Sequence, residues 1–141
     1  MTTAKYVLDT NVVSALMKGD PRVLSRLAEV GPAAVLIPQP VLSEIAYGIA
    51  RLPKSRRKRE LSTLYSRILE EFGRAAWTDE VSAHFGEQKA WTEKRGERLE
   101  DFDLAIAAHA LAEKRVLVTA DNKHMLRLPD LETEDWLEEV S

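Results

Sequence analysis

The chain has 141 residues, 45% of them hydrophobic and 30% charged, a length that suits one domain over residues 1–141 with a core needing no disulfide. It has no cysteine, which excludes a disulfide framework, a zinc–thiolate site and a cysteine nucleophile. The net charge of −3 argues against a uniformly basic nucleic-acid binder, and no apolar run approaches the ~20 residues of a membrane span.

Apolar runs typical of buried strands alternate with segments of helical spacing along the chain. The predicted strands are 6–8, 34–37, 75–77 and 116–119. The predicted helices are 12–17, 21–30, 40–51, 55–72, 79–94 and 104–111. This order predicts an α/β domain of three layers, with a central parallel sheet flanked by helices.

Local signals mark several of the expected boundaries. Asp20 followed by Pro21 has the form of an N-cap and a first helical residue, and Gly31 should end the same helix. The acidic tail after residue 130 carries Trp136 and Leu137, which should anchor it to the core.

Four acidic residues lie at the ends or borders of predicted apolar elements. They are Asp9 after the first strand, Glu44 within an apolar helix, Asp103 at the start of an alanine-rich helix, and Asp121 after the last strand. Because ligands of open α/β sheets collect at the carboxyl ends of the strands, a shared site is one explanation. Each acid also has a structural explanation: Asp103 or Asp9 as an N-cap, Asp121 in a turn, Glu44 as a solvated residue.

Taken together, clustered carboxylates resist ionisation unless a cation compensates their charge. Oxygen ligands without histidine or cysteine select hard cations, Mg²⁺ or Mn²⁺. Such a site suits in-line hydrolysis of a phosphodiester.

Ordered blocks of residues follow one another over the whole chain: 7–11 (VLDTN), 37–48 (IPQPVLSEIAYG), 96–110 (GERLEDFDLAIAAHA), 116–122 (VLVTADN) and 128–136 (LPDLETEDW). These blocks resemble the motifs of PIN-domain ribonucleases of the VapC toxin type. The resemblance implies a PIN fold and a Mg²⁺- or Mn²⁺-dependent endoribonuclease, the toxin of a toxin–antitoxin pair.

Carried over by position, the resemblance implies roles for seven residues. The metal-binding and catalytic acids would be Asp9, Glu44, Asp103 and Asp121. The supporting residues, which orient that cluster, would be Thr10, Asn11 and Thr119. Many relatives have asparagine at the position of Asp121 and an acid three residues later, where this chain has His124. Asp101 has no clear family counterpart. It could contact the metal through water, but capping its helix is the favoured interpretation.

A basic segment between Arg51 and Arg59 is the expected approach for RNA, although a solvated helix face is the more common explanation of such a segment taken alone. The candidate phosphate contacts are Lys54, Arg56, Arg57 and Arg59. Sequence preference would come from unpaired bases rather than from helical RNA.

The resemblance also implies a partner: an antitoxin segment, often with an arginine, that covers the acidic site. Apolar stripes over 41–52 and 61–69 raise the expectation of a homodimer and of larger toxin–antitoxin complexes. With no signal peptide in view, the expected location is the cytoplasm, without a membrane partner.

Three alternatives use the same residues differently. A phosphatase with Asp9 as nucleophile would need a second aspartate where Asn11 stands, so it is disfavoured. A catalytically silent interaction module would leave the carboxylates uncompensated. A DNA-acting nuclease shares the acidic cluster but normally has more chain to grip a duplex.

Overall fold

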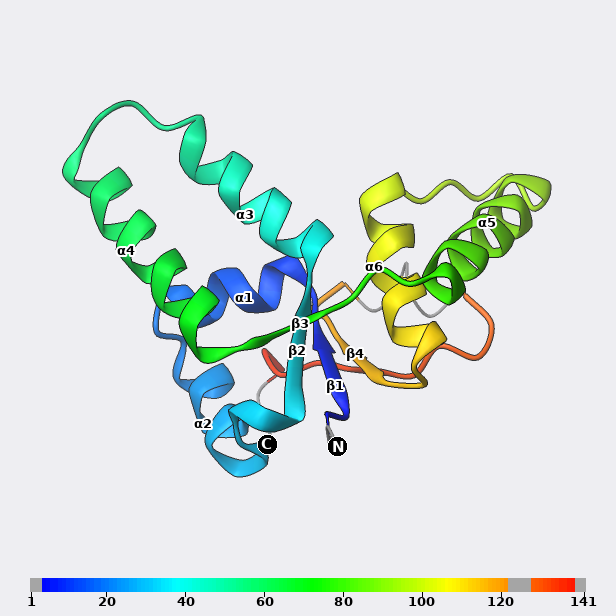
Figure 1. Cartoon of the computed structure of the whole chain (residues 1–141), viewed down its shortest axis with the longest axis horizontal. Coiled ribbons are helices and arrows are strands. Elements are labelled where there is room, and N and C mark those ends of the chain that lie inside the picture. Colours follow the sequence, from blue (N-terminus) through cyan, green and yellow to red (C-terminus); the bar gives the residue numbers. More distant parts are fainter. Residues whose placement is uncertain (1–3, 122–127, 139–141) are drawn as a thin grey trace.

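The computed structural model describes residues 4–121 and 128–138 and is built on a five-stranded sheet (Figure 1). The strands are β1 (Tyr6–Leu8), β2 (Val35–Pro38), β3 (Gly73–Ala75), β4 (Val116–Val118) and β5 (Thr133–Glu134). They lie in the order β3-β2-β1-β4-β5, and every neighbouring pair is parallel. The predicted parallel α/β sheet is confirmed.

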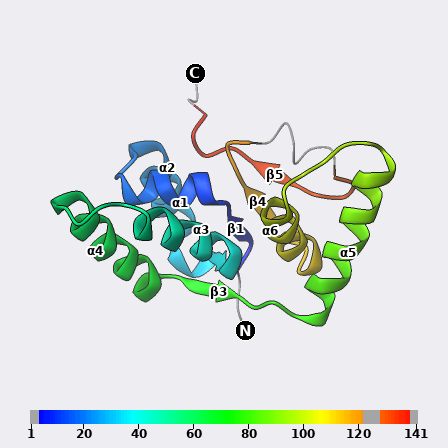
Figure 2. The same cartoon turned by 90° about the horizontal axis from the view of Figure 1, so that it is seen from above.

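Helices cover both faces of this sheet. They are α1 (Thr10–Met17), α2 (Pro21–Val30), α3 (Gln39–Ala50), α4 (Arg56–Glu71), α5 (Asp79–Lys94) and α6 (Asp101–Ala112), with a short 3₁₀ turn η1 (Pro32–Ala34). Helices α1 to α4 lie on one side and α5 and α6 on the other, as Figures 1 and 2 both show. The predicted three layers are therefore present.

Helices α2 and α4 begin where a side chain satisfies a free backbone N–H group. Asp20 accepts a hydrogen bond from the Arg22 N–H (2.9 Å), and Ser55 accepts one from the Lys58 N–H (3.1 Å). Helix α2 ends at Gly31, whose φ of 84° is accessible to glycine at little cost. These are the boundaries that the sequence signals predict.

The core lies between the sheet and its helices. Val7, Leu8 and Leu117 on the central strands have no exposed surface. On the other layer, every residue of α6 from 104 to 110 is buried. Because this stretch is covered on all sides, its apolar residues are not confined to one stripe. Its alanines are small enough for close contact with both the sheet and α5.

The structure differs from the prediction in two places at the edges of the sheet. The third strand is Gly73–Ala75, earlier than the predicted 75–77, and Trp77 lies outside it with 47% of its surface exposed. Strand β5 was not predicted, because two residues of an acidic tail carry no apolar pattern. The tail is anchored as expected: Trp136 is buried and packs edge-on against Tyr6, with ring centroids 5.3 Å apart.

The apolar stripes of α3 and α4 face each other and the core. Ile45 and Ile68 are buried, and Leu61, Leu64 and Leu69 pack against the same cluster. The Tyr65 hydroxyl donates a hydrogen bond to the Leu42 carbonyl across the two helices (3.3 Å). Core packing therefore accounts for much of the surface from which a homodimer was expected, and the homodimer itself stays a prediction.

The connections place a topological switch point beside β1. The chain moves from β1 outward to β2 and β3, then crosses back through α5 and α6 to β4 on the other side of β1. In such sheets the carboxyl ends of the strands at the switch point border a crevice for ligands.

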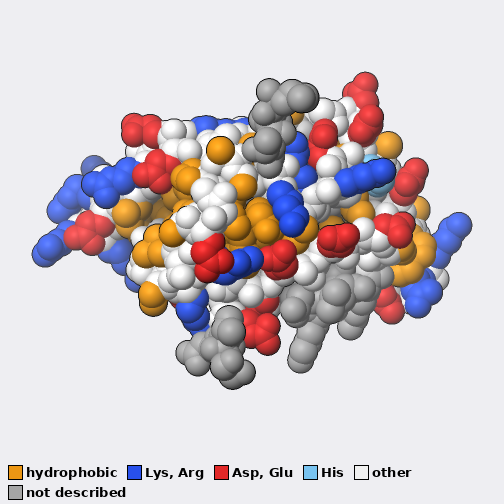
Figure 3. All heavy atoms as spheres, turned by 90° about the horizontal axis from the view of Figure 1, so that it is seen from below, with side chains coloured by type: hydrophobic (Ala, Val, Ile, Leu, Met, Phe, Trp, Pro, Cys, Tyr) orange, Lys and Arg blue, Asp and Glu red, His pale blue; other side chains and the backbone are white. Residues whose placement is uncertain are grey.

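On the face of the molecule opposite these strand ends, positive and negative side chains are interspersed (Figure 3). Within the described residues, no helix is long and apolar enough to cross a membrane.

Candidate active site

Asp9 stands at the carboxyl end of β1, directly at the switch point. Only 5% of its surface is exposed, and its Oδ1 accepts a hydrogen bond from the Thr10 N–H (2.7 Å) as the N-cap of α1. Its Oδ2 accepts a second bond from the Thr119 hydroxyl (2.7 Å). Burial raises the pKa of Asp9 above its usual value, while these hydrogen bonds lower it and the negative charge of Asp121 raises it further. The capping role is thus confirmed, and the carboxylate is also part of a charged cluster.

Thr119 connects Asp9 to the end of β4. Its buried hydroxyl donates to Asp9 and accepts a hydrogen bond from the Asp121 N–H (3.0 Å). The backbone also joins the two strand ends, because the Asp9 N–H donates to the Val118 carbonyl (2.9 Å). The positions of the two acids are therefore fixed by one shared side chain.

Asn11 fastens the same loop from the opposite side. Its Oδ1 accepts a hydrogen bond from the Ala120 N–H (3.1 Å), so the first turn of α1 holds the segment that carries Asp121. Thr119 and Asn11 therefore both connect the start of α1 to the segment after β4, and their role in orienting the acids stays a prediction.

Glu44 reaches the cluster from α3. The Thr10 hydroxyl donates a hydrogen bond to its Oε1 (2.7 Å), which ties α3 to the first residue of α1. Its side chain is half-buried rather than fully solvated. The second carboxylate oxygen, Oε2, has no hydrogen-bond partner among the described residues.

Asp103 completes the group from the opposite layer, in the first turn of α6. The predicted N-cap role is wrong, because the cap position is Glu100 and the Asp103 carboxylate accepts no hydrogen bond within residues 4–121 and 128–138. Burial, followed by the negative charges of Asp9, Glu44, Asp121 and Glu100, raises its pKa to about 6. The N-terminus of a helix favours a negative charge, so burial and like charges outweigh that effect here.

Asp103→Asn should therefore stabilise the metal-free protein at neutral and higher pH. The folded-state pKa of Asp103 lies above the usual 3.8, so the stability it contributes is complete below pH 3.8 and is lost as pH rises through about 6. The variant should gain on the order of 1–2 kcal/mol at pH 8 after allowance for solvent screening, and almost nothing at pH 4. Thermal melts in EDTA at the two pH values measure this. A variant no more stable than the wild type at pH 8 would show that the charges do not repel.

The four acids lie close enough to affect one another but do not yet form a coordination shell. In the part of the chain described here, no three acidic or histidine side chains are arranged so as to hold a metal ion. The charges of Asp9, Glu44 and Asp121 nevertheless all act on Asp103. The donor set, carboxylate oxygens with threonine hydroxyls nearby, fits a hard divalent cation in its chemistry.

The remaining acidic and histidine candidates lie away from this cluster or cannot be placed. Asp101 points to α5, where it forms an ion pair with Lys89 (3.0 Å), so its expected capping role is replaced by a contact between helices. His124 lies outside the described residues.

The structure divides the basic segment between two surfaces. Arg57 lines a pocket that also contains Thr10 and Glu44, whereas Lys54 and Arg59 line a separate hollow on α4. Arg56 pairs with Glu60 one turn along the helix (2.9 Å). Of the four predicted RNA contacts, only Arg57 lines the pocket that Glu44 also lines.

Two cations at this pocket, Lys18 and Arg51, were missing from the predicted site. For each of them, the spacing in the sequence from a predicted site residue could have indicated its position. Lys18 is the C-cap of α1 and lies eight residues after Thr10. Arg51 is the C-cap of α3 and lies seven residues after Glu44. Both spacings are two helical turns, which place each pair on one face of a helix.

The family model for the PIN domain matches residues 6–131, which include all four acids and the whole sheet except β5. The chain belongs to the PIN domain family.

Named relatives of this PIN domain are similar over nearly their full length. Ribonuclease VapC1 of Haemophilus influenzae (strain R2866) is 30% identical over 136 residues, covering 93% of this chain and 97% of the relative. Ribonuclease VapC2 of Rickettsia felis is 30% identical over 133 residues, with the same coverage. A chain in the crystal structure of VapBC2 from Rickettsia felis, bound to a DNA fragment from their promoter, superposes with a TM-score of 0.80 at 29% identity. That match covers 93% of this chain and 98% of the other.

Proposed function

We propose that this PIN domain is an endoribonuclease that hydrolyses RNA phosphodiester bonds with Mg²⁺ or Mn²⁺, and that it acts as the toxin of a VapBC-type pair. The observation that carries the proposal is the convergence of Asp9, Glu44, Asp103 and Asp121 on the switch point, with the pKa of Asp103 raised to about 6. Two relatives named as ribonucleases, each 30% identical over 93% of the chain, support the substrate class.

The cation would be held by these four carboxylates. When bound, it supplies positive charge that offsets the charge of the scissile phosphate and lowers the pKa of the attacking water. Thr119 bonds the Asp9 carboxylate and the backbone N–H of Asp121, and Thr10 bonds one oxygen of Glu44, so these hydroxyls would help to place the ligands. No hydrogen bond among the described residues holds the Asp103 carboxylate or the second oxygen of Glu44, so both would be free to turn toward the ion.

The protein's own groups also account for substrate orientation and proton transfer. Arg57 lies in the pocket that contains Glu44, where it can hold a phosphate on one side of the acids. Any of these carboxylates that does not bind the cation directly would stand where it can accept a proton from the attacking water.

The partner of such a toxin would be an antitoxin that covers the acids. An arginine is the side chain best suited to this task, because its guanidinium stays charged and can bind carboxylates in pairs. The same oxygens would then be unavailable to a cation, which gives inhibition a direct physical cause.

Purified protein should cleave total bacterial RNA in Mg²⁺ or Mn²⁺ and should not cleave it in EDTA. The carboxylates repel one another and the phosphate, so the reaction needs the compensating cation. Fragments are resolved by gel electrophoresis, with cleavage restored by adding metal in excess of EDTA as the control. Cleavage that continues unchanged in EDTA contradicts the metal mechanism, and cutting of DNA but not RNA would favour the DNA-acting alternative.

A further inference from the structure

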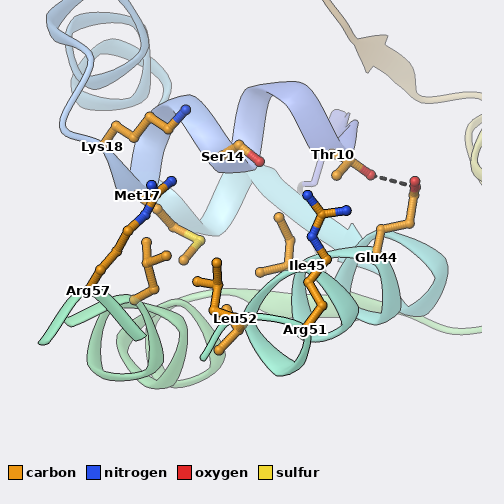
Figure 4. A pocket seen from close by; sticks show the side chains of 12 residues that line it. Thr10, Ser14, Met17, Lys18, Glu44, Ile45, Arg51, Leu52 and Arg57 are labelled. Carbon is orange, nitrogen blue, oxygen red and sulfur yellow. Dashed lines mark hydrogen bonds between the residues drawn. The ribbon is translucent and has the colours of Figure 1, made fainter. Parts of the chain in front are cut away.

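A pocket of about 260 Å³ opens beside the acidic cluster, between α1, α3 and α4. Figure 4 shows that Thr10 and Glu44, joined by their hydrogen bond, form one end of it. The volume lies just below the range of about 300–1,000 Å³ that is usual for small-molecule sites. A guest of this size that touches the acidic end would lie next to the reacting phosphate.

The floor of the pocket is apolar. Met17 and Ile45 are buried, and Ile49, Leu52 and Leu61 complete the surface. A flat apolar group can displace water from this floor, and a methionine sulfur contacts aromatic rings favourably.

Gly48 keeps one wall of the pocket open. It lies inside α3 with an ordinary helical φ, and a Cβ built there meets nothing within 4 Å. Neither a turn nor a close backbone approach accounts for glycine at this position, where alanine would favour the helix. The missing side chain leaves room in the pocket that this residue lines.

Three cations surround the apolar floor. Figure 4 shows Lys18, the C-cap of α1, and Arg57 of α4 at one end of the pocket, and Arg51 extending toward Thr10 and Glu44. Within the described residues, Lys18, Arg51 and Arg57 form no ion pair, and the Arg51 guanidinium lies 6.0 Å from the centroid of the Tyr47 ring. Other arginines of the same layer, such as Arg26, are paired with acids. The pocket therefore combines an apolar surface with unpaired positive charge.

We propose that this pocket binds one unpaired nucleotide of the RNA, adjacent to the phosphate that is cut. The base would rest on the apolar floor against the plane of Arg51, and Arg57 with Lys18 would hold a neighbouring phosphate. The inference rests on the proposed ribonuclease function and adds to it a subsite that selects single-stranded RNA. Charge favours this occupant, because an RNA phosphate complements three cations.

The methyl group of Met17 reports on the pocket without any cleavage. The chain has three methionines, Met1, Met17 and Met125, and the Met17 signal is assigned by its loss in Met17→Leu. In EDTA, nucleoside 5′-monophosphates should shift the ¹³C-methyl resonance of Met17 through the ring current of the base. Ribose 5-phosphate, which lacks a base, should not. An equal shift with ribose 5-phosphate, or no shift with any nucleotide, overturns the proposal.

Filling the pocket tests its role in catalysis. Gly48→Leu should abolish the Met17 shift and lower kcat/KM for single-stranded RNA about 10-fold, the size expected for losing one base contact. The matched control is Gly86→Leu, the same change at an open helical position of α5, which should leave both unchanged.

The outcomes separate this subsite from the ribonuclease proposal. A Met17 response in a protein that cleaves no RNA supports the subsite while the proposed function fails. Unchanged cleavage by Gly48→Leu, or an equal loss in both leucine variants, overturns the subsite alone. If Gly48→Leu cleaves normally but no longer binds the antitoxin, the pocket belongs to a protein partner instead.

Discussion

Asp9→Asn is expected to abolish RNA cleavage while leaving the protein folded. The amide keeps an oxygen for the Thr10 N–H, and the Thr119 hydroxyl can rotate to accept a bond from the new NH₂ group. What the variant loses is the negative charge at the centre of the cluster. Changes in residues that only orient metal ligands cost about 10–100-fold, so loss of a ligand charge should cost more than ~100-fold in kcat/KM.

Asp130→Asn serves as the control for this prediction. Asp130 is exposed, and its backbone has a φ of 65°, a conformation that asparagine accepts readily. The control should cleave RNA like the wild type, and circular dichroism should show the same fold in both variants. Full activity in Asp9→Asn would place the catalytic site elsewhere.

Expression of the chain alone in a bacterial cytoplasm should stop growth. An endoribonuclease without its antitoxin degrades RNA that the cell needs, so the arrest follows from activity rather than from misfolding. Asp103→Asn should grow normally at the same level of soluble protein, because it lacks one of the proposed ligands and is expected to be the more stable of the two. Growth curves with parallel measurement of soluble protein give the answer. Harmless expression of soluble wild type would contradict the toxin role.

Much of the fold could be predicted because its elements carry strong local signals. The helix from Asp20-Pro21 to Gly31 has a cap, a proline and a glycine in the places that helix ends require, and the structure begins and ends it there. Strand β5 has no such signal: its two residues are fixed by pairing with β4 and by the burial of nearby Trp136. Elements that depend on tertiary contacts are not visible in local sequence.

The acids of the site could be predicted for a similar reason, since each follows or borders an apolar element. Their connections could not. The bridge from Thr119 to both Asp9 and Asp121, and the bond from Thr10 to Glu44, join residues far apart in the sequence. Charge alone could not show which basic side chains line the pocket of Glu44, because Arg56 is paired with Glu60 and Lys54 and Arg59 line a separate hollow. Contact of these residues with RNA stays a prediction.

The most direct test of this account is to locate Mn²⁺ in crystals of the protein by anomalous diffraction. We expect a peak at the carboxyl ends of β1 and β4, about 2.1 Å from oxygens of at least two of the four acids, with the others bound through water. Small rotations of Asp103 and Glu44 toward the ion should accompany it, because these side chains do not form a coordination shell without metal. A peak away from Asp9, Glu44, Asp103 and Asp121, at a Mn²⁺ concentration that supports RNA cleavage, would contradict the account.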